Sequence, residues 1–280
     1  MEASGTHREQ DPAGRLSGFV SDLTITVLLW AYYTAGFVLF FAPFYLLAYL
    51  FAKDTAAGFQ KLNSLFYRLF FRMVRLFIPA CRWEIDPGVR RIRSAVIVSN
   101  HVSYLDPILL ISLYGRHTTI AKERLFHLPI YGRMIALSGY LPSTATGRLA
   151  DLMLRQMDKM PGHLGAGGNL IVFPEGTRGR DGQVGRLNKG AFKIARLCRA
   201  PISVLFISNT DKLFKPGRFL FDTQRTNTIH VEQLAAIEPD YDADSFSVNE
   251  LMARVHDLLK AHNAKLPAAV KWAATAPEEL

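Results

Sequence analysis

The chain has 280 residues, 49% of them hydrophobic, and a formal net charge of +9. Its mean hydropathy of +0.10 is on the apolar side for a soluble protein. The two cysteines, Cys81 and Cys198, form no CxxC pair, which argues against a zinc site or a disulfide framework. The basic excess suits an anionic partner: nucleic acid, anionic lipid or a phosphate-bearing substrate.

The N-terminal part contains a long uncharged stretch. No charged residue occurs from Leu23 to Ala52. As one helix this run would be about 45 Å long, against roughly 30 Å of bilayer hydrocarbon. Because Pro43 should kink or break the helix, we expect either one tilted, kinked span or two shorter helices that enter one leaflet. The predicted organisation is a polar segment at 1–22 followed by membrane-anchoring helices at 23–80.

A basic stripe follows the apolar run. Lys61, Arg68, Arg72 and Arg75 fall within about 60° on a helix, beside an apolar face. This pattern favours a helix in the headgroup region of an anionic membrane, while a surface helix packed on a domain core remains the alternative. The Lys and Arg excess after the apolar run places the rest of the chain on the cytoplasmic side.

From Trp83 onward, short apolar runs alternate with helical patterns. This alternation predicts an α/β domain at 81–264, with a mainly parallel sheet flanked by helices, and a flexible tail at 265–280. The strands are expected at 95–99, 169–173 and 202–207, with weaker candidates at 118–121, 140–142 and 228–231. The helices are expected at 106–114, 129–137, 148–160, 189–198 and 248–261.

Two polar motifs directly follow predicted strands, where ligand sites form in such sheets. The first is NHVSYLD, residues 100–106. Its Asp106 follows His101 across a strand-to-helix turn, so the carboxylate can return to the imidazole and hold one tautomer. The other ring nitrogen is then free to act as a general base. A purely structural Asp106 that caps its helix is the alternative.

The second motif is FPEGTRGR, residues 173–180. Pro174 and Gly176 predict a tight turn after the strand. The guanidinium groups of Arg178 and Arg180 suit phosphate, although a solvated loop is the better interpretation for Arg180. Glu175 can fix an arginine or accept a hydrogen bond from a substrate hydroxyl.

Together the two motifs resemble the glycerolipid acyltransferases, whose best-known members are the 1-acylglycerol-3-phosphate acyltransferases. Further segments resemble the same family in order and spacing: AKERLFHLPIYGRMIALSG at 121–139, LNKGAF at 187–192 and APISV at 200–204. The resemblance covers roughly Trp83 to Ser208.

The resemblance implies a role for each matching residue. His101 would be the general base and Asp106 its orienting partner. The acceptor's glycerol phosphate would bind to Glu175, Gly176, Thr177 and Arg178, and Lys122 would stabilise developing charge or phosphate. No metal or cofactor is implied.

One position departs from the family pattern. Ser143 and Thr144 stand where enzymes of this family that acylate glycerol phosphates usually have an Asp-Arg pair. A cationic phosphate contact is therefore missing there, unless Arg148 replaces it. The departure makes a lyso-ornithine lipid or another lysophospholipid a more plausible acceptor than it would otherwise be.

The sequence thus predicts a 1-acyl-sn-glycerol-3-phosphate O-acyltransferase of phospholipid biosynthesis. It would act at the cytoplasmic membrane, on membrane lipids and a lysophospholipid, with acyl-CoA or acyl carrier protein as donor. The alternatives are an acyltransferase for another lysolipid, an acyl-thioesterase, and a non-catalytic membrane tether. Nucleic acid binding is a poor explanation of the charge, because much of the basic excess lies beside the membrane segment and the phosphate motif.

Overall fold

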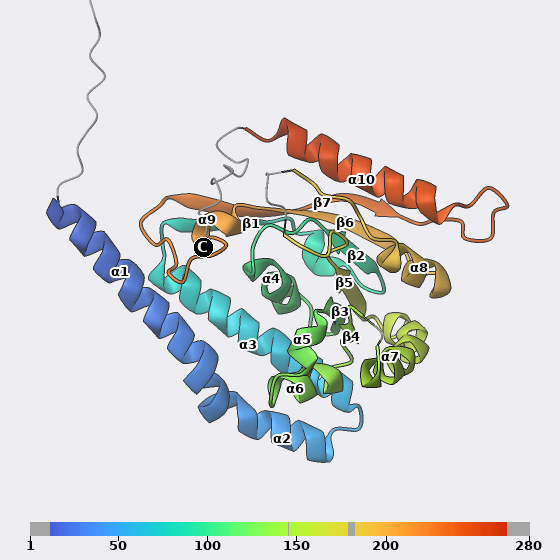
Figure 1. Cartoon of the computed structure of the whole chain (residues 1–280), viewed down its shortest axis with the longest axis horizontal. Coiled ribbons are helices and arrows are strands. Elements are labelled where there is room, and N and C mark those ends of the chain that lie inside the picture. Colours follow the sequence, from blue (N-terminus) through green and yellow to red (C-terminus); the bar gives the residue numbers. More distant parts are fainter. Residues whose placement is uncertain (1–11, 145, 179–182, 268–280) are drawn as a thin grey trace, which may run out of the picture.

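A computed structural model describes residues 12–144, 146–178 and 183–267. The chain begins with one long helical run (Figure 1), made of α1 (Pro12–Ala31), the π-helical segment η1 (Tyr32–Phe41) and α2 (Ala42–Phe51). Pro43 does not break this run. It lies in the first turn of α2, where a backbone N–H needs no helical partner, and the wider turns of η1 precede it. Of the two alternatives, the structure therefore has one continuous helical run.

The next helix, α3 (Thr55–Phe77), begins at Asp54, whose carboxylate accepts a hydrogen bond from the Ala57 N–H. Of the two interpretations of this segment, a surface helix packed on a domain core agrees better with the structure than a helix surrounded by lipid headgroups. Helix α3 lies between α4 on one side and the N-terminal run of α1, η1 and α2 on the other, as Figure 1 shows. The apolar face expected beside the basic stripe includes Leu65 and Leu76, and this prediction is only partly right because both are exposed. The four residues of the basic stripe are all exposed: Lys61, Arg68, Arg72 and Arg75.

The α/β domain contains a seven-stranded sheet in the order β1-β7-β6-β2-β5-β3-β4. All pairs are parallel except β6 with β7. The six expected strands are present, and the late one is much longer than expected; β1 was not predicted. The strands are β1 (Cys81–Ile85), β2 (Val96–Ser99), β3 (His117–Ala121), β4 (Leu141–Pro142), β5 (Asn169–Val172), β6 (Ile202–Ser208) and β7 (Asn227–Ile237).

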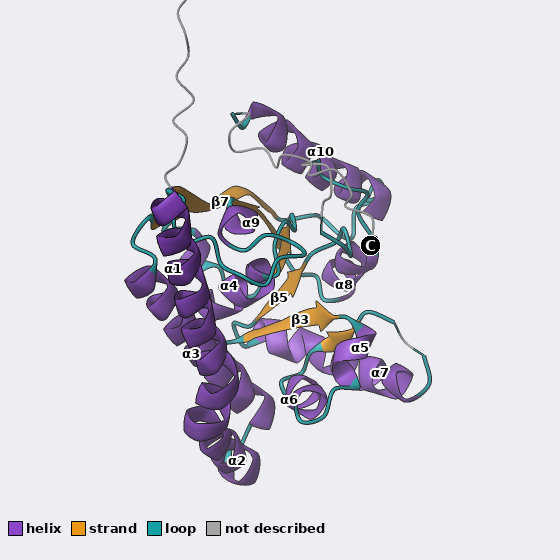
Figure 2. Ribbon diagram, turned by 60° about the vertical axis from the view of Figure 1, so that its left-hand side comes forward, coloured by secondary structure: helices purple, strands orange, loops and turns teal. Residues whose placement is uncertain are grey.

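Helices cover both faces of the sheet (Figure 2). One face carries the N-terminal helices and α4, and the other carries α7, α8 and α10, each face with its own apolar cluster. Helix α7 continues past Pro161, beyond its expected end. The remaining helices are α4 (Leu105–Leu113), α5 (Glu123–Phe126), α6 (Tyr131–Leu137), α7 (Arg148–Gly165), α8 (Gly190–Leu197), α9 (Thr210–Leu213), α10 (Val248–Lys265) and the short 3-10 turn η2 (Val89–Arg91).

The N-terminal helices and the sheet share one apolar cluster, which contains Leu29, Phe66 and Ile97 alike. The N-terminal helices are therefore built into the domain along its length. The predicted domain boundary at 80/81 stays a prediction. The polar segment at 1–22 and the tail at 265–280 also stay predictions, because most of each lies outside the described residues.

Candidate active site

The two motifs meet at the carboxyl edge of the sheet. NHVSYLD follows β2, the central strand, and EGTR follows the adjacent β5. On the other side of β2, parallel β6 ends at Ser208 and leads into α9. Because parallel strands end at a common edge, three segments far apart in the chain converge here.

His101 and Asp106 make the predicted contact. The imidazole Nδ1 lies 2.9 Å from Asp106 Oδ2. Since an ionised carboxylate only accepts hydrogen bonds, Nδ1 carries the proton and Nε2 keeps its lone pair. The His101 side chain is 16% exposed while Asp106 is fully buried, so the ring can be reached from outside and its partner cannot. This arrangement orients an accessible base.

The Asp106 carboxylate has further partners. Its Oδ2 accepts hydrogen bonds from the N–H groups of Val102 and Ser103, and its Oδ1 accepts one from the Thr210 hydroxyl, at the start of α9. The alternative of a helix-capping Asp106 is thus compatible with the pairing, because the same carboxylate shapes the turn and holds the imidazole. Four donors thus fix the orientation of this buried carboxylate.

Asn100 attaches the motif to the neighbouring strand. Its amide accepts a hydrogen bond from the Ile207 N–H at 2.7 Å and donates one to the Ile207 carbonyl at 2.8 Å. The side chain thereby reproduces the pairing of a strand residue where β2 ends. The backbone before His101 is held to β6 by this pair of bonds.

Glu175 joins the two motifs through backbone groups. One carboxylate oxygen accepts a hydrogen bond from the His101 N–H at 3.1 Å, and the other accepts one from the Gly185 N–H at 2.8 Å. Burial raises the pKa of this carboxyl, while these two N–H groups act in the opposite direction. No arginine contact to Glu175 is present among the described residues, so its observed contacts position the loop.

Arg178 lies on the aromatic ring of Tyr104. Its guanidinium carbon is 3.6 Å from the ring centroid, and Nη2 donates to the Tyr104 hydroxyl at 2.8 Å. Nη1 is buried and has no partner in the described part of the chain. A cation held in one place with a donor left over is suited to an anionic group.

The other residues of the second motif form its turn. Gly176 has a φ of 68°, a left-handed conformation that favours glycine. A side chain there would also approach the Asn188 amide at 3.2 Å. Thr177 is exposed, and Arg180 lies outside the described residues. The turn therefore requires glycine for its backbone shape.

Lys122 lies at the same edge of the sheet, directly after β3, and is exposed. Ser143 and Thr144 follow β4 and surround Glu123: the Ser143 hydroxyl accepts from its N–H, and the Thr144 hydroxyl donates to its carboxylate. A carboxylate and hydroxyls thus occupy this place. The suggested substitute, Arg148, opens α7 and is exposed.

Thr210 and Tyr104 were not recognised from the sequence. Thr210 lies more than a hundred positions from its partner Asp106, and only the adjacency of β6 and β2 brings it there. Tyr104 lies inside the first motif, but its contact with Arg178 depends on where the fold places the loop of the second motif. Within the described ranges, no three His, Cys, Asp or Glu side chains are arranged to hold a metal ion.

Comparisons with known proteins agree with this geometry. A family model described as Acyltransferase matches residues 85–208. The human 1-acyl-sn-glycerol-3-phosphate acyltransferase beta is 30% identical over 201 residues, which cover 66% of this chain and 67% of that protein. An Arabidopsis thaliana chloroplastic 1-acyl-sn-glycerol-3-phosphate acyltransferase is 34% identical over 125 residues, 44% of this chain. The match spans only about a third of that plant protein, 34% of its length.

The fold has a solved counterpart. The crystal structure of the 1-acyl-sn-glycerophosphate acyltransferase PlsC from Thermotoga maritima superposes with a TM-score of 0.65 at 21% identity, covering 89% of this chain and 98% of that one. At this identity the likeness shows the fold. Taken with the family match and the human relative, the two motifs at one sheet edge show that the chain belongs to the glycerolipid acyltransferase family.

Proposed function

We propose that this protein transfers an acyl group from a thioester donor to the free hydroxyl of a lysophospholipid, with 1-acyl-sn-glycerol 3-phosphate as the first acceptor to test. The observation that carries the proposal is the His101–Asp106 pair, an accessible imidazole held at 2.9 Å by a buried carboxylate. The names of the relatives support the acceptor class.

His101 acts as the general base. Its Nε2 takes the proton of the acceptor hydroxyl as the oxygen attacks the thioester carbonyl. The new C–O bond forms, the C–S bond breaks, and the thiolate leaves with the proton returned by the imidazolium. Asp106 stabilises the imidazolium throughout and keeps the ring in the required tautomer. The transfer uses no cofactor and no covalent enzyme intermediate.

Arg178 binds the phosphate of the acceptor. The Tyr104 ring holds the guanidinium in place, and the free Nη1 donor points to an anionic ligand. Glu175 positions the loop that carries Arg178 beside His101, because its carboxylate accepts hydrogen bonds from the N–H groups of His101 and Gly185. Lys122, exposed at the same edge, adds positive charge for the donor or acceptor phosphate.

The long N-terminal helix holds the enzyme on one leaflet. It is long and apolar enough to cross a membrane, since Leu16–Phe51 comprises 36 residues. Its inner face is bound to the domain, however: the Thr26 hydroxyl accepts from the Phe221 N–H, and Tyr32 donates to the Phe66 carbonyl. A helix covered by protein on one side inserts only its exposed side. The exposed basic stripe of α3 favours the cytoplasmic leaflet.

A lysolipid panel tests the proposed function. Purified protein is given labelled acyl-CoA or acyl carrier protein with lysophosphatidate, other lysophospholipids or a lyso-ornithine lipid, and the products are identified by mass. The expected product is the diacyl lipid. Because Glu123 and two hydroxyls stand where a cation was expected, a preference for a lysolipid other than lysophosphatidate is the second candidate.

The same assay separates the rival functions. His101→Ala should lower transfer by about 10² or more, the usual contribution of a general base, with its melting temperature preserved. Near-normal transfer by a folded His101→Ala would rule out the mechanism. Free fatty acid released without any lysolipid would indicate a thioesterase. Vesicle binding without turnover on any acceptor would indicate a tether.

A further inference from the structure

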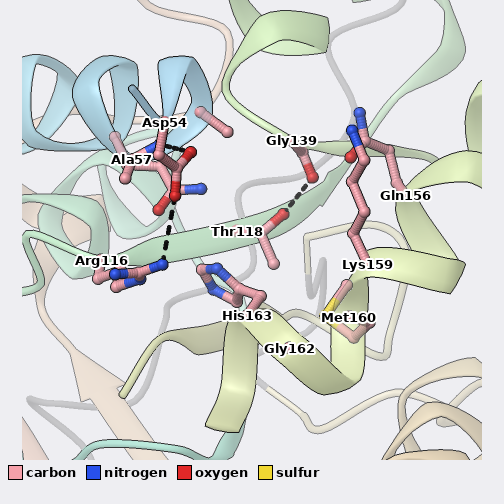
Figure 3. A pocket seen from close by; sticks show the side chains of 12 residues that line it. Asp54, Ala57, Arg116, Thr118, Gly139, Gln156, Lys159, Met160, Gly162 and His163 are labelled. Atoms are coloured by element: carbon pink, nitrogen blue, oxygen red, sulfur yellow. Dashed lines mark hydrogen bonds and ion pairs between the residues drawn. The ribbon is translucent and has the colours of Figure 1, made fainter. Parts of the chain in front are cut away.

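Figure 3 shows a polar pocket whose lining does not include His101. It has a volume of about 310 Å³ and lies between the start of α3, α7 and the beginnings of β3 and β4. Arg116 immediately precedes β3, and Gly139 lies shortly before β4. Because β2, β5, β3 and β4 are parallel, this is the amino edge of the sheet, opposite the catalytic edge.

Gln60 presents an unused acceptor in this pocket. The residue is 3% exposed, and its Nε2 donates to the Ser138 carbonyl at 2.9 Å. That bond fixes the amide orientation, because a flipped amide would place two oxygens against each other. The Oε1 atom is buried and has no partner within the described residues. An unpaired buried acceptor is costly, so a donor that reached it from the pocket lined by Gln60 would stabilise it.

Gln156 repeats this arrangement on another wall. Its Nε2 donates to the Ala136 carbonyl at 3.2 Å, so its oxygen faces away from that carbonyl. Both glutamine amides lie within 3.6 Å of where a side chain on Gly139 would begin. The two amides therefore flank one glycine, and any side chain there would fill the space between them.

Cationic groups complete the lining. Arg116 Nε is buried without a partner among the described residues, while its Nη2 contacts Asp54 at 3.4 Å. Figure 3 shows Lys159 beside Gln156, on the side of the pocket opposite Arg116 and Asp54. Two cations against one carboxylate favour an anion, and the amide oxygens require hydroxyl donors. A bare phosphate dianion would leave the amides unsatisfied, and a cationic ligand would be repelled.

We propose that this pocket binds a hydroxyl-bearing phosphate group, delivered as the glycerol phosphate headgroup of a membrane lipid. The lipid source follows from the position of the pocket. Phe51, the last residue of α2, is 76% exposed and lies three positions before Asp54 of the pocket wall. A lipid with its headgroup in the pocket would have its acyl chains near the exposed apolar face of α2. The site would hold the α2–α3 corner at the membrane, separately from catalysis.

Vesicle binding tests this proposal. The probes are phosphatidylcholine vesicles with phosphatidylglycerol or with the same fraction of phosphatidylserine, which has equal net charge but no glycerol hydroxyls. The full-length protein should bind the phosphatidylglycerol vesicles on the order of tenfold more tightly, as one or two extra hydrogen bonds to neutral amides would produce. Lys159→Gln and Arg116→Gln should remove this preference.

Lys61→Gln is the matched control, because it removes the same charge from an exposed site on α3 outside the pocket. It should weaken binding to both vesicle types equally. Lys159 is exposed, so its substitution should leave the melting temperature unchanged. Equal affinity of the wild type for the two vesicle types would overturn the proposal, as would indistinguishable effects of Lys159→Gln and Lys61→Gln.

Soluble sn-glycerol 3-phosphate distinguishes a lipid headgroup from a free phosphate compound as the ligand of this pocket. Competition with phosphatidylglycerol vesicles that depends on Lys159 would support the assigned chemistry and site. Thermal stabilisation by the soluble compound that is lost in Lys159→Gln, without any vesicle preference, would overturn the lipid source. None of these measurements uses acyl transfer, and the dependence on Lys159 separates this pocket from the phosphate site proposed at Arg178.

Discussion

At the residue scale, the site depends on how the side chains of His101 and Arg178 are held. Asp106 orients His101 and receives three more hydrogen bonds, from the N–H groups of Val102 and Ser103 and the hydroxyl of Thr210. Arg178 is held by the Tyr104 ring. Both supports restrict rotation before a substrate arrives, and pre-organisation of this kind favours binding and catalysis.

The Tyr104 ring can be tested separately from its hydroxyl. Tyr104→Leu removes both contacts to Arg178, so the KM for the lysolipid should rise by about tenfold, the scale of a partly desolvated cation–π contact. Tyr104→Phe keeps the ring and should show a smaller rise. Steady-state kinetics with the acceptor and donor varied separately measure this, and the kcat and the donor KM should change little. An equal rise in both KM values would contradict the assignment.

At the element scale, the N-terminal helix combines a buried face with an exposed apolar one. In α2, Tyr45 is buried while Leu46, Leu47 and Leu50 are more than half exposed, at 58%, 51% and 59%. Water-facing leucines in such a row are unfavourable in a soluble protein and favourable at a membrane. This asymmetry supports insertion into one leaflet.

Leu47→Asp combined with Leu50→Asp should weaken vesicle binding at least tenfold. Each leucine that enters the apolar layer contributes about 1.5 kcal/mol or more, and the introduced charges oppose insertion. Vesicle sedimentation measures the effect. Leu197→Asp is the control, since this leucine is 64% exposed on α8, on the other face of the sheet. Equal losses in the control and the double variant would refute insertion through α2.

At the scale of the whole molecule, a buried polar chain connects the N-terminal helical run to the sheet. Tyr45 of α2 donates to the Asn63 oxygen of α3, and Asn63 donates to the Tyr140 hydroxyl before β4. Tyr140 donates to Nε2 of His117 in β3, whose Nδ1 donates to the Tyr114 carbonyl. Each group in this chain has a defined role as donor or acceptor, so the tautomer of His117 is fixed and the ring is neutral.

This histidine makes the stability of the fold depend on pH. Burial lowers the pKa of His117 from 6.5 to about 4. The unfolded chain therefore binds a proton between these values that the folded chain does not. The contribution of His117 to the free energy of unfolding is fully present above pH 6.5. It decreases as the pH falls toward 4, by up to about 3 kcal/mol.

Urea titrations at several pH values measure this loss. His117→Gln should be less stable at pH 7 because it breaks the polar chain, but its stability should fall less steeply between pH 6.5 and 4. Burial also lowers the pKa of His163, so the wild-type decrease exceeds that of one group, and the informative quantity is the difference between the two proteins. Identical slopes would show that His117 does not cause the loss.

The sequence by itself determined the fold class, the family and the first motif. Strand and helix periodicity identify six of the seven strands, because buried parallel strands are short apolar runs. The His101–Asp106 contact is also local, since one turn between β2 and α4 brings both residues together. The apolar N-terminal run was equally visible. Each of these features depends on neighbours within a few positions.

Only the tertiary structure decided how the distant segments meet. Thr210 reaches Asp106 because β6 lies beside β2, and Glu175 binds the backbone of His101 because β5 lies on its other side. The pattern of α3 left open whether its apolar face meets lipid or a domain core, and the contacts with α4 decide for the core. The polar pocket at the amino edge joins four elements. Such contacts depend on sheet order and helix packing, which local hydrophobic periodicity does not encode.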